Sequence, residues 1–121
     1  MARRPGEYLA DIQEAAAAIR AYTRSGKRAF LGSAMARDAV IARIIQIGEA
    51  VKGAQAGGID LETLAPEVPW QQIAGMRDLL SHQYWRTDPQ IVWAVVAKDL
   101  KPLEASLRKI RPARRSAKRK K

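Results

Sequence analysis

One short segment of the chain holds residue types suited to acid–base chemistry on a phosphate ester. Residues 76–84 read MRDLLSHQY and contain the only histidine of the 121 residues. An imidazole can move protons near neutral pH, and a guanidinium can stabilise negative charge on phosphorus with its planar set of donors. His82 and Arg77 therefore predict cleavage of an RNA phosphodiester, in which one proton leaves the 2′-OH and another reaches the leaving oxygen.

Asp78 is spaced to assist His82. Residues four apart share a helix face, so the carboxylate can hydrogen-bond one ring nitrogen. Arg77 is five residues from His82 and does not line up with it. One histidine is too few for a separate acid and base, so a symmetric dimer that places two such sets across a cleft would supply both. Simpler roles remain open: His82 can interact with a helix dipole, and Arg77 with Asp78 can form a solvated pair.

The elements that position this segment are predicted to be helices. Apolar residues recur at three- and four-residue steps in four segments, and no segment alternates as a strand does. The four helices are expected to begin after Pro5, after a Ser33 cap, near Trp70 and after an Asp88 cap. This pattern predicts an all-α fold, an antiparallel four-helix bundle, with residues 76–84 at the end of the third helix.

The second predicted helix is apolar on more than one side. Ile41 and Ile45 widen its stripe beyond a single face. Such a helix is either central in the bundle or has a second partner, and the second alternative is a first indication of a dimer.

The basic charge is concentrated at the C-terminus. Nine of the twenty-two Lys and Arg residues follow Leu107 with no acidic residue among them, whereas the whole chain carries a net charge of +10. Such a run repels itself and cannot bury a core. We therefore predict a bundle domain over residues 1–110 and a disordered basic tail over residues 111–121, which either solubilises the protein or strengthens RNA or DNA binding through counterion release.

The composition excludes several other classes of site. The chain has no cysteine and one histidine, so neither a metal site nor a bound cofactor is expected. Its longest apolar run is far too short to span a membrane, and acidic residues interrupt the N-terminal apolar segment, as a secretory signal would not allow. We expect a cytoplasmic protein without a membrane partner.

The motif resembles one known family. RDLLSHQY fits the R-x4-6-H-x-Y motif of the HepT-like ribonucleases in the HEPN superfamily. The similarity covers about residues 8–110 and includes IIQIGEAV, PWQQIAGM before the motif, and DLKPLEASL after it.

This resemblance implies a dimeric helical bundle with the motif in a cleft between protomers, acting as a metal-independent endoribonuclease toxin. It also implies an antitoxin, a small MNT-type nucleotidyltransferase that transfers AMP to the motif tyrosine. Carried over to this chain, Arg77, His82 and Asp78 are the catalytic set. Tyr84 is the AMPylated residue and Glu49 a further cleft residue; Tyr84 can instead simply cover the bundle end.

Two other functions remain open. Members of the family have also been viewed as non-catalytic, substrate-binding partners of nucleotidyltransferases, and a bundle dimer could act in this way. The basic tail alone could also make the chain a nucleic-acid-binding protein.

Overall fold

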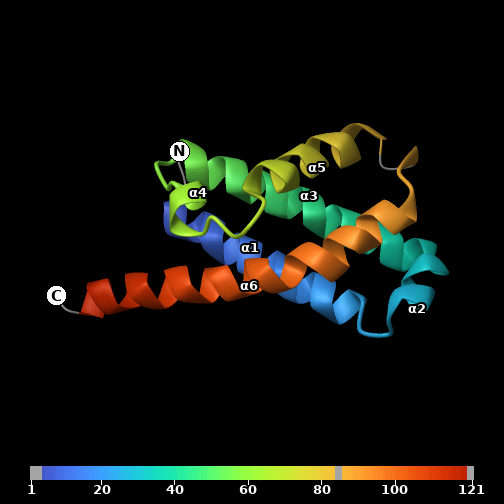
Figure 1. Ribbon diagram of the computed structural model, residues 1–121, viewed down its shortest axis with the longest axis horizontal. Coiled ribbons are helices and arrows are strands. Elements are labelled where there is room, and N and C mark those ends of the chain that lie inside the picture. The colour runs from blue at the N-terminus through green and yellow to red at the C-terminus, as the bar shows by residue number, and fades with distance from the viewer. Residues whose placement is uncertain (1–3, 84–85, 120–121) are drawn as a thin grey trace.

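The computed structural model describes residues 4–83 and 86–119, and for residues 111–119 only the course of the backbone. The described residues are all-helical and contain no strand, which confirms the predicted class. The four long helices are α1 (Pro5–Tyr22), α3 (Ala34–Ala56), α5 (Trp70–Gln83) and α6 (Pro89–Arg119). Successive long helices run in opposite directions (Figure 1).

The predicted caps are confirmed at two helix starts. The Ser33 hydroxyl accepts a hydrogen bond from the backbone N–H of Ala36 at 3.1 Å. The Asp88 carboxylate accepts one from the N–H of Gln90 at 2.9 Å. Each bond satisfies a backbone donor that the first turn of a helix leaves without a partner, so local chemistry sets where these helices begin.

Two short helices were not predicted. Helix α2 spans Lys27–Leu31 and helix α4 spans Leu61–Leu64. Each is too short to show a helical period, and each is anchored by a buried residue, Phe30 in α2 and Leu61 in α4. The ring of Phe30 packs on Trp93 of α6 with 5.4 Å between ring centroids, so tertiary contact stabilises a segment too short to form a stable helix alone.

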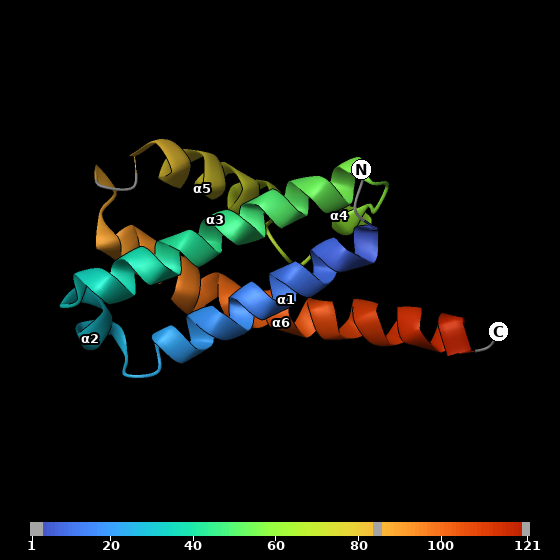
Figure 2. The ribbon, with the colours of Figure 1, turned by 180° about the vertical axis from the view of Figure 1, so that it is seen from behind.

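Helix α3 is the central element. It lies between α1 and α5 in both ribbon views (Figures 1 and 2) and packs most extensively against these two helices. Its buried residues are Val40, Ile41, Ile44, Ile47, Gly48, Ala50, Val51 and Ala54. The wide apolar stripe is therefore covered within the chain, and it no longer argues for a second copy.

The connection that leads into α5 is fixed at two points. The buried indole of Trp70 donates to the carbonyl of Ala65 at 2.9 Å. The buried Ser106 hydroxyl of α6 donates to a carboxylate oxygen of Glu67 at 2.6 Å. These bonds hold the start of α5, and thereby the direction in which it crosses α3.

Helix α6 includes most of the segment that we predicted to be disordered. It continues to Arg119, and its red C-terminal part extends beyond the other helices (Figure 1). The disorder of residues 111–121 stays a prediction. Among the described residues, none of the helices combines the length and the apolarity that crossing a bilayer requires.

Candidate functional site

Helices α3 and α5 cross closely at Gly48. This glycine is buried, and a Cβ atom at position 48 would overlap the first side-chain carbons of Arg77. The missing side chain lets α5 approach α3 until the Arg77 guanidinium reaches a carboxylate on α3. Gly48 therefore has a specific role, which is to admit the arginine.

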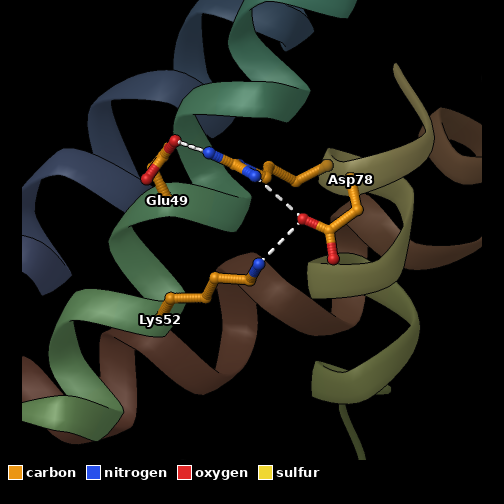
Figure 3. Close-up of polar contacts among 4 residues, drawn as sticks. Glu49, Lys52 and Asp78 are labelled. Carbon is orange, nitrogen blue, oxygen red and sulfur yellow. Dashed lines mark hydrogen bonds and ion pairs between the residues drawn. The ribbon is translucent and has the colours of Figure 1, made fainter. Parts of the chain in front are cut away.

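Arg77 is held between two carboxylates. Its Nε donates to Glu49 Oε2 at 3.0 Å, and Nη2 donates to the same oxygen. Its Nη1 donates to Asp78 Oδ1 at 2.8 Å, and Lys52 Nζ donates to this Asp78 oxygen at 2.8 Å. Figure 3 shows the chain of contacts that runs from Glu49 through the guanidinium to Asp78 and Lys52. We call these four residues the Arg77 network.

The network keeps its central groups ionised at the surface. The Arg77 side chain is 25% exposed and that of Asp78 is 52% exposed. The hydrogen bonds that Arg77 donates to Glu49 first, and to Asp78 second, raise the pKa of Arg77. Lys52 first, and Arg77 second, lower the pKa of Asp78. Both groups are charged at neutral pH, and the arginine fork has a fixed orientation.

His82 has a contrasting environment. It is exposed in the last turn of α5, one turn beyond Asp78. Within the described part of the chain, the His82 ring has no hydrogen bond or ion pair, and the partners of Asp78 are Lys52 and Arg77 instead. A carboxylate binds a cation more strongly than a neutral ring, which explains why Asp78 turns toward α3.

Of the other residues at or near the predicted site, one is part of the Arg77 network as predicted and one was not predicted. Glu49, predicted as a cleft residue, is in direct contact with Arg77. Tyr84 lies outside the described residues. Lys52 was missed, although one sequence signal was present: it is three residues from Glu49 and therefore shares its helix face.

Helix α5 carries both an oriented guanidinium and an exposed imidazole. The described part of the chain holds no group of three or more His, Asp or Glu side chains arranged to bind a metal ion. The arrangement offers a fixed cation and an exposed imidazole five residues apart on α5. This combination can bind an anion and move a proton at the same helix.

Fold and site together define an all-helical protein with an Arg-x4-His pair on one helix. A family model described as "Ribonuclease HepT-like" matches residues 12–110, which include every element from α1 to α6 in whole or in part. The chain belongs to the ribonuclease HepT-like family.

Three relatives illustrate this membership. A "Probable ribonuclease HepT" of Thermococcus cleftensis is 37% identical over 112 residues, 92% of this chain and 99% of that protein. A "Putative RNase" of Methanocaldococcus jannaschii is 32% identical over 94 residues, 77% of this chain and 84% of that protein. A "Gamma-glutamylcyclotransferase and putative RNase" of the same organism is 36% identical over 85% of this chain, which matches only 46% of that longer protein. No solved structure gives a comparable match.

Proposed function

We propose that the chain is a metal-independent endoribonuclease toxin in which Arg77 and His82 cleave RNA. The observation that carries the proposal is the oriented Arg77 fork, fixed by Glu49 and Asp78, on the helix that presents an exposed His82. Family membership and the names of the relatives, a probable ribonuclease and a putative RNase, support RNA as the substrate.

The chemistry follows from these groups. The 2′-OH attacks the adjacent phosphorus, the bond to the 5′ oxygen breaks, and a 2′,3′-cyclic phosphate and a 5′-OH result. His82 accepts the proton of the 2′-OH or delivers one to the leaving oxygen. Arg77 stabilises the charge that develops on the phosphoryl oxygens. Asp78 orients the guanidinium, and the substrate phosphate takes the place of Glu49 on Arg77.

The second half of the acid–base pair comes from a second copy of the chain. A single histidine cannot act as acid and base at the same moment, and His82 is exposed where another protomer can approach. A homodimer with both α5 ends at one cleft would bring two imidazoles to the same phosphate. This dimer is part of the proposal.

The regulation we propose rests on the family motif. Tyr84 follows His82 by two residues, and an MNT-type nucleotidyltransferase antitoxin would transfer AMP from ATP to its hydroxyl, with release of pyrophosphate. The added phosphate and adenosine would block the cleft by bulk and by repulsion of RNA. Intact mass, measured before and after incubation with the nucleotidyltransferase and ATP, should increase by one AMP in the wild type and not in Tyr84→Phe.

Single substitutions test the catalytic assignment. His82→Ala and Arg77→Ala should each abolish cleavage of a labelled RNA while helicity and dimer mass stay unchanged. Arg20→Ala is the matched control, because Arg20 pairs with Glu104 away from the site. If either catalytic variant still cuts RNA at the wild-type rate, the assignment is wrong.

A second candidate is a non-catalytic substrate-binding partner of a nucleotidyltransferase. One observation favours it: both carboxylates that surround Arg77 already satisfy its charge, so RNA must displace one of them. A purified, unmodified wild type that binds its nucleotidyltransferase and never cuts RNA would establish this alternative.

A further inference from the structure

One turn of the bundle carries three exposed positive charges that the proposed chemistry does not use. Arg24, Lys27 and Arg28 lie between the end of α1 and the first turn of α2, and all three are exposed. Within the described part of the chain, none of their side chains takes part in an ion pair or a hydrogen bond. We call these three residues the basic corner.

The fold holds the basic corner in a defined shape. The Thr23 hydroxyl donates to the carbonyl of Ile19 at 2.7 Å where α1 ends. Gly26 has a φ of +94°, in the left-handed region that favours glycine, and this conformation turns the chain into α2. The buried Phe30 then anchors α2 on Trp93 of α6. The three cations are therefore presented by an anchored turn.

The charges of the bundle are divided between its two ends. Residues 23–43 contain five basic side chains and one acidic side chain, whereas residues 57–69, which include α4, contain three acidic side chains and no basic one. Helices α2 and α4 lie at opposite ends of the bundle in both ribbon views (Figures 1 and 2). The positive potential at the α2 end attracts a polyanion, and the acidic α4 end repels one.

The basic end is also the end at which His82 is exposed. Helix α5 ends and α6 begins on the same side as α2 (Figures 1 and 2). Arg86 lies between these two helices; it is exposed and forms no ion pair with any other described residue. The C-terminal part of α6, which leads into the basic tail, extends toward the opposite end (Figure 1). Within one protomer, the basic corner therefore shares an end with His82 and the tail does not.

We propose that the basic corner binds the phosphate backbone of the RNA on one side of the cleaved bond, with Arg86 between the corner and His82. Guanidinium and ammonium groups bind phosphate oxygens without reading the bases, so the contact adds affinity and fixes the course of the strand without a sequence preference. Three like charges in one turn repel one another, and bound phosphates relieve this repulsion. The inference rests on the proposed ribonuclease function and adds a substrate-binding surface outside the cleft.

Binding can be measured without cleavage. The probe is a labelled single-stranded RNA with 2′-O-methyl groups, which removes the attacking hydroxyl. In the triple variant Arg24→Gln/Lys27→Gln/Arg28→Gln, the affinity at low salt should fall about tenfold or more. The slope of log K against log salt should become shallower by about 2, because each lost phosphate contact contributes about 0.7. Circular dichroism should show unchanged helicity, since the three side chains are exposed.

A second triple variant controls for the loss of net charge. Lys98→Gln/Lys101→Gln/Lys109→Gln removes the same three positive charges from exposed positions farther along α6. Its affinity for the RNA should fall much less than that of the corner variant. An equal loss in the two variants would mean that only the net charge matters, and it would overturn the proposal.

Cleavage tests whether the corner acts on long substrates. A dinucleotide contains only the cleaved bond, whereas a long RNA can also reach the corner. The ratio of kcat/KM for the long RNA to that for the dinucleotide should fall about tenfold in the corner variant and stay near the wild-type ratio in the α6 variant. The loss should be in KM more than in kcat, because the corner does not touch the reacting atoms. An unchanged ratio in the corner variant would contradict the proposal.

The outcomes separate this surface from the ribonuclease function. Wild-type RNA affinity and salt dependence in the corner variant, with normal cleavage, would overturn the surface and leave the ribonuclease function standing. The same result together with lost binding to polyglutamate would overturn it in favour of an acidic protein partner. A wild type that never cuts unmodified RNA, but whose RNA affinity depends on the corner, would support the surface and refute the ribonuclease function.

Discussion

Arg77 and His82 are on the same helix, and their surroundings differ completely. Arg77 is fixed by Glu49 and Asp78 at a close helix crossing, whereas His82 is exposed at the helix end. One side of the site is thus preorganised within a single chain. The other side is presented outward, where RNA and a second protomer can complete it. Under the proposed function, charge stabilisation is built into the fold, whereas proton transfer depends on assembly with a second protomer.

We expect the largest effect on RNA cleavage from a substitution that removes the planar donor set of Arg77 and keeps its positive charge. Arg77→Lys cannot hold Glu49 and Asp78 at the same time, because an ammonium is a point charge without a planar set of donors. We expect kcat/KM for RNA cleavage to fall about 10²- to 10³-fold. Arg20→Lys is the control and should cleave normally. Wild-type activity in Arg77→Lys would mean that a point charge suffices and that the preorganised fork is irrelevant.

A smaller effect is expected from a substitution that forces α5 away from α3 at Gly48. Gly48→Ala places a Cβ atom against Arg77, so α5 must move away from α3, at a cost of about 1–3 kcal/mol in the free energy of unfolding. Gly75→Ala on the same α5 meets no atom within 4 Å and should raise stability by up to about 1 kcal/mol. Urea unfolding measures both. Equal stability of the two variants would show that the crossing is not tight.

Deletion of the basic tail should change RNA affinity and leave the proposed catalytic residues unchanged. Deletion of residues 111–121 removes seven of the twenty-two Lys and Arg residues and leaves the Arg77 network in place. RNA affinity at low salt should fall on the order of tenfold, and the slope of log K against log salt should become shallower by about 0.7 for each RNA phosphate that the tail no longer neutralises. Binding isotherms at several salt concentrations measure this, and an unchanged slope would assign the tail to solubility alone.

We expect the smallest effect in the pH dependence of the stability that the Arg77 network contributes. Because the folded-state pKa of Asp78 lies below its ordinary value of 3.8, its contribution to stability is present above that value and is lost as the pH falls through the lower, folded-state pKa. The stability difference between wild type and Asp78→Asn should therefore be largest near neutral pH and shrink in acid. Urea unfolding at a series of pH values checks this; a difference that grows in acid would contradict it.

Much of the fold followed from local patterns. The four long helices, the Ser33 and Asp88 caps and the placement of the motif at the end of α5 are consequences of periodicity and capping, which act over a few residues. Helices α2 and α4 were not predicted, because each is too short to show a helical period and depends on a buried anchor, to which α4 adds the Asp60 cap. The disordered tail over residues 111–121 stays a prediction from charge density alone.

The sequence by itself determined which residues could do chemistry and on which helix they lie, because both depend on residue type and short-range spacing. Only the tertiary structure decided their partners. Glu49 and Lys52 are 28 and 26 residues from the side chains that they bind, and their meeting depends on how closely α5 crosses α3 at Gly48. The close approach of the Tyr8 ring to α3 depends in the same way on the missing side chain at Gly53. Such contacts arise from packing between distant segments, which no local pattern encodes.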